Sequence, residues 1–298
     1  MAILGIDEVG RGPWAGPLVV GACVLGDAQI EGLTDSKKLT PKKREALAPI
    51  IREKASCGLG WVSAQELDEI GLSAALCKAC REAVSQIKTP FHEIIIDGTV
   101  NFLRGTKLEP YVQVLTKADL LVPEVSAASI VAKVARDQYM VELREKYPGY
   151  GFEKHVGYGT AAHKAAIEKL GVCDEHRKSF RPIHEAIENT AGRKAENAAA
   201  DYLRTQGFAI VAQNWKQKRC EIDIVAEKDA KLYFCEVKYI RNEAQGAGVD
   251  RIGGKKLQQM RFAAEYYMAT TKYTGDAQLA AIEVSGDNFL IRDFLVLE

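Results

Sequence analysis

The chain has 298 residues, which is enough for one large domain or two ordinary ones. Its 40 lysines and arginines balance 40 acids, so no protein-wide positive field marks a nucleic-acid partner, and any such binding must come from local patches. No apolar run is long enough to cross a bilayer, and no basic leader precedes the first apolar residues. We therefore predict a cytoplasmic protein with no membrane attachment.

Five strands rich in Ile, Val and Leu are predicted in the first part of the chain, at residues 2–7, 17–26, 58–63, 93–97 and 111–116. Helices are predicted from Pro41, from about Leu72 to Ile87, from Pro123 through Tyr147, and from Thr160 to Leu170. Two closely joined strands followed by strands that alternate with helices indicate an α/β domain with a mixed sheet. The later helices are expected to pack on one side of it.

A polar stretch at residues 188–192 is predicted to be a linker between a first domain, 1–187, and a second domain, 193–298. In the second domain we predict a helix over 193–205, strands at 208–214, 219–226 and 232–240, a helix from about Val249 to Thr270, and strands at 278–285 and 288–296. This is a second α/β arrangement. The order of its elements differs from that of the first domain, so the two domains are not duplicates.

The seven cysteines form an odd set, and a Cys-x-x-Cys pair occurs once, at Cys77 and Cys80 inside a helical pattern. No second pair completes a zinc site. Reduced thiols, buried or half-buried, are predicted.

Two adjacent acids, Asp7 and Glu8, follow an apolar strand and precede a turn made by Gly10, Arg11 and Gly12. Carboxylate oxygens suit Mg²⁺ or Mn²⁺, and the glycines let the main chain come close to a ligand. Because neighbouring strand residues face opposite ways, the two carboxylates can share a site only if the strand ends or bulges there. A metal site beside phosphate is predicted, with a solvated acidic pair as the alternative.

Two further acids, Asp97 and Asp119, also lie at or just after strand ends. Together with Asp7 and Glu8 they could converge at one sheet edge and hold two divalent ions. Asp97 precedes a glycine, so a simple turn is the alternative at that position.

Five motifs occur in one order along the first domain: GIDEVGRG at 5–12, TDSKKL at 34–39, IDG at 96–98, VSAASIVAKVARD at 125–137 and GYGT at 157–160. This set resembles the ribonuclease HII family over residues 1 to about 185. The resemblance implies a ribonuclease H-like fold with a helical C-terminal portion. It also implies hydrolysis of RNA in RNA–DNA hybrids and at single ribonucleotides in duplex DNA, by in-line attack of water between two metal ions, which leaves 5′-phosphate and 3′-hydroxyl ends.

Carried over to this sequence, the resemblance assigns the metal ligands to Asp7, Glu8, Asp97 and Asp119. It assigns reading of the ribose 2′-hydroxyl to residues 10–12.

The same resemblance makes Tyr158 the side chain that stacks on the neighbouring deoxyribose, and Lys37 a phosphate contact. An ordinary surface lysine is the alternative at Lys37. His155 and Val156 depart from the family, which more often has a short polar or basic pair at these positions. This difference could alter substrate binding.

Two other site types fit the sequence poorly. The glycines at 10, 12 and 16 resemble a dinucleotide-binding turn, but Pro13 and Pro17 prevent the required helix and the spacing is off by one. The five histidines form no His-Glu-x-x-His pattern, so a zinc hydrolase is not expected. His176 and Arg177, close to Phe180, are predicted to be a packing and capping cluster.

In the second domain, alternation predicts that Glu221 and Asp223 share one face of a strand and that Glu236 and Lys238 share a face of the next strand. A hairpin would place the two strands side by side. Such a set suits a metal-dependent nuclease in which Lys238 orients water or offsets phosphate charge. A solvent-facing row of cross-strand ion pairs is the alternative.

Residues 191–298 resemble the YraN family of endonuclease-like proteins through Glu196 and the segments 213–215, 221–223 and 236–239. The resemblance implies a restriction-endonuclease-like core with a site at Glu196, Asp223, Glu236 and Lys238, and Glu221 beside them. Cys220, Ile240 and Ala280 depart from the family pattern.

For this domain we consider a metal-dependent nuclease acting on DNA, including branched or single-stranded DNA, and a noncatalytic nucleic-acid-binding module. The runner-up for the whole chain is a nucleic-acid-binding protein with inactive sites, against which the four intact ligands of the first domain argue. No obligate protein partner is indicated.

Overall fold

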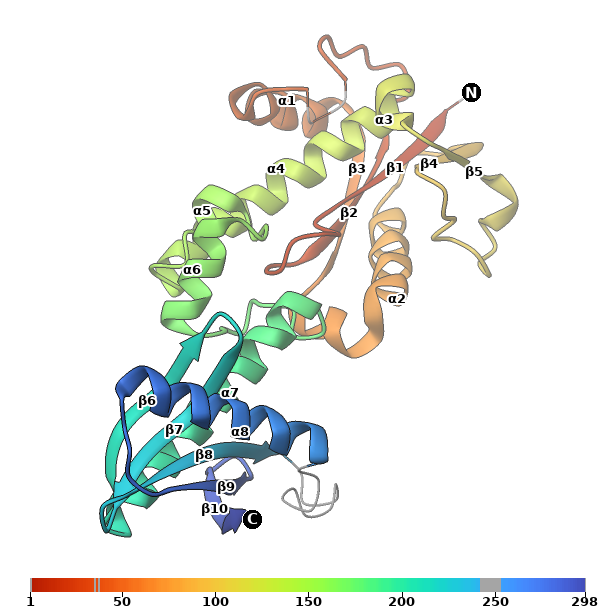
Figure 1. The fold of residues 1–298 in the computed structure, drawn as a ribbon. Helices are drawn as coiled ribbons and strands as arrows, with labels where there is room; N and C mark the ends of the chain where they lie inside the picture. Colours follow the sequence, from red (N-terminus) through yellow and green to blue (C-terminus); the bar gives the residue numbers. More distant parts are fainter. Residues whose placement is uncertain (1, 35, 37, 242–252, 298) are drawn as a thin grey trace. The chain divides into compact units, whose positions relative to one another are not determined.

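The fold is taken from a computed structural model, which describes residues 2–34, 36, 38–241 and 253–297. The chain divides into two units, Met1–Ala186 and Ile187–Glu298 (Figure 1). The described residues of each unit form a five-stranded sheet with helices packed against it. No helix in this described part is long and apolar enough to cross a membrane.

The first sheet has the strand order β3-β2-β1-β4-β5. Its strands are β1 (Ile3–Val9), β2 (Leu18–Val24), β3 (Ser56–Val62), β4 (Glu93–Asp97) and β5 (Val112–Leu115). β1 and β2 are antiparallel, as are β2 and β3, while β1, β4 and β5 run parallel. This is the predicted mixed sheet, and it brings the carboxyl ends of β1 and β4 to the same edge.

The helices of the first unit are α1 (Pro41–Lys54), α2 (Ala64–Ser85), α3 (Ala118–Leu121), α4 (Pro123–Lys146), α5 (Phe152–His155), α6 (Ala161–Leu170) and the start of α7 (Arg181–Thr205), with a 3-10 turn at Glu109–Tyr111. The α1 start was predicted: Thr40 Oγ1 accepts a hydrogen bond from the Lys43 backbone N–H at 3.4 Å, one residue ahead of Pro41. The helix predicted from about Leu72 agrees with the second of two helical segments in α2, and the first segment, from Ala64 to the kink at Gly71, was not predicted. Ser63 caps the helix, and Gly71, with φ +78°, interrupts it just before Leu72.

Helix α4 lies directly on β1 and β2 because glycines face it. A Cβ added to Gly5 would lie 2.2 Å from the Glu124 carbonyl carbon, and one added to Gly21 would lie 2.4 Å from the Ala128 oxygen. Helix α2 covers the other face, where Leu4 and Ile6 pack in the apolar core. The close approach of α4 places its serines beside the acidic end of β1.

In the second sheet, β8 and β9 pair in parallel and the other neighbours are antiparallel, in the order β10-β9-β8-β7-β6. Its strands are β6 (Ala209–Gln217), β7 (Cys220–Lys228), β8 (Lys231–Ile240), β9 (Ala277–Ser285) and β10 (Leu290–Leu297). Helix α7 packs on one face, and α8 (Gly254–Thr271) packs on the other. The predicted start of α8 near Val249 falls outside the described residues.

The predicted linker at 188–192 is wrong as a description of the backbone, because these residues lie within α7, which begins at Arg181 rather than Arg193. Gly192 in a helix costs only about 1 kcal/mol relative to alanine. The ion pair between Arg181 and Glu185 and the burial of Ala195 favour the helix on either side of this stretch. A polar stretch with one glycine therefore does not end the helix.

All seven cysteines are free thiols, and each is buried or half-buried, as predicted. Cys77 and Cys80 both lie in α2, and only Cys80 is fully buried.

Candidate functional site

Three of the predicted ligands gather at the carboxyl edge of the first sheet. Ile6 pairs with Ile96 across the parallel strands β1 and β4, so Asp7 and Asp97 are the next residues on neighbouring strands. Asp97 Oδ1 accepts a 2.7 Å hydrogen bond from the Ala118 backbone N–H, which ties the end of β4 to the start of α3. Asp119 follows directly in α3 and is 6% exposed.

Asp7 is held in a buried, negatively charged environment. Burial, with smaller contributions from the charges of Glu8 and Asp97, raises its pKa to about 7, and a hydrogen bond from Ser129 acts in the opposite direction. A carboxylate surrounded by like charge in a low dielectric is strained without a counter-charge. Within the described residues, no three acidic, histidine or cysteine side chains already stand close enough together to hold a metal ion.

The expected end or bulge of β1 at Asp7 and Glu8 is wrong. The pairing with β2 continues without a shift through both residues, Asp7 opposite Gly21 and Glu8 opposite Val20. Strict alternation therefore puts Asp7 on the α4 face with Gly5 and Glu8 on the α2 face with Ile6. The strand continues because backbone pairing with β2 satisfies its polar groups up to Val9.

The buried side chain of Arg177 fixes the Gly10-Arg11-Gly12 turn. Arg177 donates from Nη2 to the Gly10 carbonyl at 2.6 Å, from Nη1 to the Arg11 carbonyl at 3.2 Å, and from Nε and Nη2 to the Gly16 carbonyl at 3.0 and 2.9 Å. Both Arg136 and Arg177 are 0% exposed. The Arg11 side chain itself remains exposed and lies 3.7 Å from Glu8.

Arg136 joins the segment that follows the turn, at Ala15 and Pro17, to the Tyr158 loop. Its Nε donates to the Pro17 carbonyl at 2.9 Å, and its Nη1 donates to the Val156 carbonyl at 2.9 Å. Gly10 has φ +87°, and a Cβ there would lie 2.4 Å from the Arg136 Nε, so glycine is required by both conformation and space. No role was predicted for Arg136, and Arg177 was predicted only as part of a packing and capping cluster. The available signal was an arginine inside an otherwise apolar or aromatic motif.

The Tyr158 loop packs on the chain that follows the glycine turn. The Gly157 carbonyl accepts hydrogen bonds from the Trp14 and Ala15 backbone N–H groups at 2.8 and 3.3 Å. Tyr158 is 44% exposed, so its ring is available to a ligand. The structure thus brings the two predicted substrate-contacting segments together.

Three buried histidines support this loop. His163 Nδ1 lies 2.9 Å from the Tyr158 carbonyl, and its Nε2 lies 3.1 Å from His176 Nε2. The His155 ring stacks on His163 at a centroid distance of 4.3 Å. Burial lowers the pKa of His163 and His176 to about 4, so both stay neutral at neutral pH. The predicted packing role of His176 fits this arrangement.

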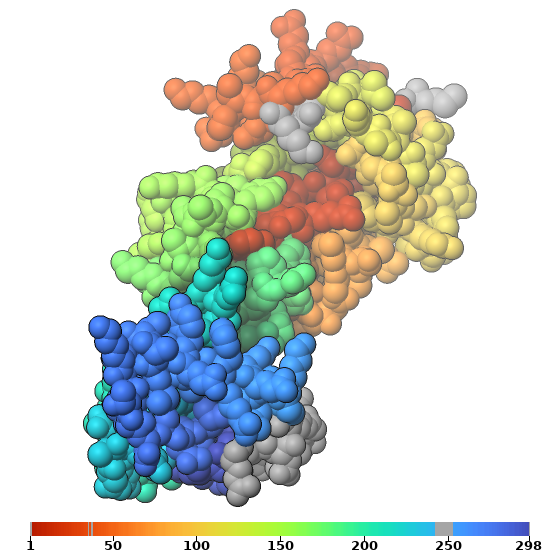
Figure 2. Space-filling model, in the orientation of Figure 1, coloured from red at the N-terminus to blue at the C-terminus, as the bar shows by residue number. Residues whose placement is uncertain are grey.

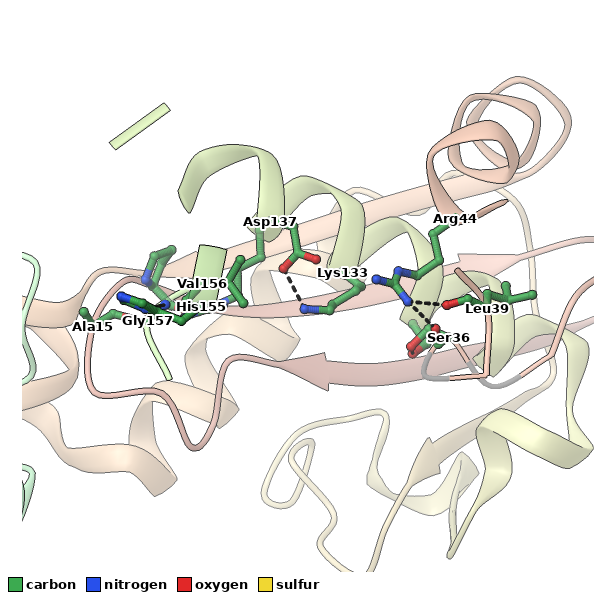
Figure 3. Close-up of polar contacts among 12 residues, drawn as sticks. Ala15, Ser36, Leu39, Arg44, Lys133, Asp137, His155, Val156 and Gly157 are labelled. Carbon is green, nitrogen blue, oxygen red and sulfur yellow. Dashed lines mark hydrogen bonds and ion pairs between the residues drawn. The ribbon is translucent and has the colours of Figure 1, made fainter. Parts of the chain in front are cut away.

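Ser36 and Leu39 are held by Arg44 of α1, which donates to both carbonyls, each at 2.7 Å (Figure 3). Ser36 Oγ lies 2.9 Å from Ser129 Oγ of α4. Ser129 also forms a hydrogen bond with Asp7, so the contact between Ser36 and Ser129 connects this segment to the acidic edge of the sheet. Lys37 lies outside the described residues.

In the second unit, Asp223 and Glu236 lie at the point where β7 and β8 separate. The pairing of these strands stops at Ile224 opposite Cys235, and Asp223 Oδ2 accepts a 2.8 Å hydrogen bond from the Val237 backbone N–H. Burial, and then the charge of Glu236, raises the pKa of Asp223 to about 6. These two carboxylates therefore form an electrostatically coupled pair.

The alternation used to place Glu221 and Asp223 on one face is interrupted. Ile222 packs in the cluster of α8, whereas Ile224 packs in the cluster of α7 on the opposite face. The change of face lies at Asp223, next to the β6 residue Asn214, which has φ +53°. A local irregularity of the strands at this point therefore breaks the alternation of side chains that was used to place Glu221 and Asp223 on one face.

The remaining predicted side chains surround the Asp223–Glu236 pair. Phe234 packs towards α8 and Val237 towards α7, so alternation places Glu236 and Lys238 on the α8 face. Glu236 forms a 2.5 Å ion pair with Lys256, and Glu221 forms a 2.9 Å ion pair with Lys216.

Glu196 of α7 accepts a 2.7 Å hydrogen bond from Asn214 Nδ2. Burial and the charge of Asp223 raise the pKa of Glu196, which shows that it belongs to the same electrostatic group.

Comparisons with known proteins divide the chain in the same way. The family model "Ribonuclease HII" matches residues 4–185, and the model "Uncharacterised protein family UPF0102" matches residues 195–284. A ribonuclease HII of Vibrio parahaemolyticus is 48% identical over 187 residues, which cover 62% of this chain and 87% of the relative.

Solved structures support the fold. The ribonuclease H2 of Pyrococcus horikoshii is 29% identical and has a TM-score of 0.55, with 63% of this chain and 98% of that chain covered. Bst-RNase HIII in complex with Mn²⁺ is 21% identical, with a TM-score of 0.52 and coverage of 63% and 70%, a likeness of fold. By the match to its first unit, the chain belongs to the ribonuclease HII family of nucleases, which hydrolyse RNA in RNA–DNA hybrids.

Proposed function

We propose that the first unit cuts RNA–DNA hybrids and duplex DNA with a single embedded ribonucleotide, with water attacking in line and 5′-phosphate and 3′-hydroxyl ends as products. The observation that carries the proposal is the placement of Asp7, Asp97 and Asp119 at one sheet edge, in the unit where two buried arginines join the turn at 10–12 to the Tyr158 loop.

The acidic edge fits divalent cations. Its donors are carboxylate oxygens, which Mg²⁺ and Mn²⁺ prefer, and the raised pKa of Asp7 beside Glu8 and Asp97 marks a place where a positive charge would relieve repulsion. Asp7, Asp97 and Asp119 would hold the ions, and Glu8, on the opposite face of β1, would contribute through its charge, which acts on Asp7. When bound, two such ions activate water and offset charge on the leaving oxygen.

The chain's own residues position the substrate. The turn at 10–12 presents backbone and the exposed Arg11 side chain to the ribose 2′-hydroxyl, the group that distinguishes RNA from DNA. Tyr158 stacks on the adjacent deoxyribose, and Lys37 contacts phosphate. Arg136 and Arg177 hold the turn and the tyrosine loop at a fixed separation, so a 2′-hydroxyl and its neighbour are read together.

The direct test uses the full chain carrying Glu236→Ala, which removes the DNA cutting proposed below for the second unit, with Mg²⁺ or Mn²⁺ on three labelled duplexes: an RNA–DNA hybrid, DNA with one ribonucleotide, and all-DNA. Cleavage of the first two, with ends that a ligase accepts, is the expected result. Cleavage of all three duplexes at equal rates by this unit would contradict reading of the 2′-hydroxyl.

For the second unit we propose a metal-dependent DNA nuclease with Asp223, Glu236 and Lys238 at its centre and Glu196 and Glu221 beside them. The coupled, half-buried pair of Asp223 and Glu236 at the separation of two strands supports this function. Lys238, on the same face as Glu236, would orient water or offset phosphate charge.

In an Asp7→Asn background, we expect DNA cutting in Mg²⁺ or Mn²⁺ that falls by roughly a hundredfold or more in Glu236→Ala, because a coordinating carboxylate is lost. Glu227→Ala, at the exposed far end of the same hairpin, is the matched control and should cut normally. Gel analysis of branched and single-stranded DNA gives the rates. DNA binding without any cutting would instead identify a noncatalytic module.

A further inference from the structure

A groove of about 630 Å³ lies between the β6–β7 hairpin and α8 in the second unit. Figure 2 shows these two elements, teal and blue, side by side at the surface. The groove is lined by Lys216, Gln217, Lys218, Arg219, Cys220, Glu221, Lys255, Lys256, Gln258, Gln259, Met260 and Phe262. Five of these side chains are cationic and one is acidic, which contrasts with the zero net charge of the whole chain.

The cations of the groove fall into two groups. Lys216 and Lys256 pair with Glu221 and Glu236. The other three (Lys218, Arg219 and Lys255) are exposed and have no acidic partner among the residues that the structure describes.

The position of Lys255 is unfavourable for the helix itself. It lies in the first turn of α8, which holds no acidic residue, and a positive charge there opposes the helix dipole. An anionic ligand would compensate for this concentration of like charge.

Exposed aromatic rings border the same groove. Phe262 lines it and is 45% exposed, and Tyr266, one turn further along α8, is 42% exposed. Their ring centroids are 6.2 Å apart, and Tyr266 lies 6.1 Å from Trp215 of β6. Large aromatic side chains that remain exposed beside cations form the combination that binds unpaired bases and their phosphates.

The groove leads to the acidic pair. Glu221 and Met260 line both the groove and a small adjoining space, and Glu236 lines that space as well. The Lys256–Glu236 ion pair joins the groove wall to the same carboxylate. A strand lying in the groove would therefore pass next to the residues to which we assign the second nuclease activity.

We propose that this groove binds single-stranded nucleic acid, with phosphates on Lys218, Arg219 and Lys255 and bases stacked on Phe262 and Tyr266. The bases of an intact duplex are stacked on one another and offer no free face to these rings, so unpaired strands are preferred. The inference deepens the nuclease function proposed for the second unit and names its substrate class.

The test measures binding of fluorescein-labelled oligo(dT) and of a hairpin duplex to the full chain by anisotropy, in EDTA, so that no cutting occurs. Arg219→Glu is expected to weaken oligo(dT) binding roughly tenfold and to reduce its salt dependence, because a phosphate contact is lost. Lys272→Glu, an exposed charge reversal at the far end of α8, is the matched control and should bind as the unchanged chain does. Equal weakening by both variants would overturn the proposal.

The aromatic contact is tested separately. Phe262→Ala is expected to weaken oligo(dT) binding roughly tenfold, and Phe262→Trp to restore it, while duplex binding stays unchanged in both. Loss of duplex and oligo(dT) binding to the same extent would contradict a single-strand site. Normal groove binding without any cutting by the Asp7→Asn chain would refute the nuclease function alone. Cutting with unaltered binding in the groove variants would refute the groove alone.

Discussion

Asp97→Asn is expected to lower the rate of cleavage of a duplex with one ribonucleotide by roughly a thousandfold or more, which corresponds to about 4 kcal/mol of transition-state stabilisation. The substitution removes one negative charge from the acidic edge. It keeps the Oδ1 that accepts the 2.7 Å hydrogen bond from the Ala118 backbone N–H, so the hydrogen bond that links β4 to α3 is retained. Substrate binding should therefore persist.

Single-turnover cleavage and a filter-binding titration, both in Mg²⁺, separate the two effects for Asp97→Asn. Glu93→Gln is the matched control, because Glu93 begins the same strand at the opposite sheet edge and is also half-buried. It should cut at nearly the normal rate. Undiminished turnover by Asp97→Asn would refute the assignment of the active site.

Arg177→Met is expected to lower the free energy of unfolding of the first unit by about 3–5 kcal/mol. Its guanidinium is the donor to the carbonyls of Gly10, Arg11 and Gly16, and a methionine leaves these acceptors unsatisfied in a buried place. Because the turn at 10–12 is held by these bonds, kcat/KM on the single-ribonucleotide duplex should also fall.

Urea unfolding gives the stability of the Arg177 variants, and initial rates give kcat/KM. Arg181→Met is the control: this side chain is 89% exposed, and its loss should change stability by no more than about 0.5 kcal/mol. If Arg177→Met does not fold, Arg177→Lys keeps the charge but not the planar fork, and it should fold with reduced kcat/KM. Normal kcat/KM in folded Arg177→Lys would show that the turn is positioned by other contacts.

The order of strands and helices could be predicted because most of their signal is local. The β4 strand is a short apolar run that ends at Asp97, and α1 has both a capping threonine and a proline at its first position. The boundaries of α2 and α7 were missed for a common reason. Gly71 interrupts a helix and Gly192 does not, so the presence of a glycine in a helical pattern does not by itself locate a helix end.

The site was predicted less completely than the fold. Residue type and spacing located the acids, but the faces of Glu8 and Asp223 depend on how β1 pairs with β2 and on the irregularity at Asn214. The bracing by Arg177 joins residues more than 160 positions apart in the chain, and no local pattern reports such a contact. The basic groove likewise combines a hairpin and a helix that are distant in sequence.

The proton affinity of Asp7 links function to stability. Its pKa is about 7 in the folded chain against an ordinary value of 3.8, so the folded state holds a proton that the unfolded state releases between these values. The resulting stability is fully present below the ordinary pKa and is lost as the pH rises to about 7, by up to about 1.4 kcal/mol for each pH unit. At the pH where Asp7 is ionised and ready to bind a cation, the folded unit without that cation is at its weakest. Binding of a cation at Asp7 would therefore release the proton from this carboxyl group and stabilise the folded unit.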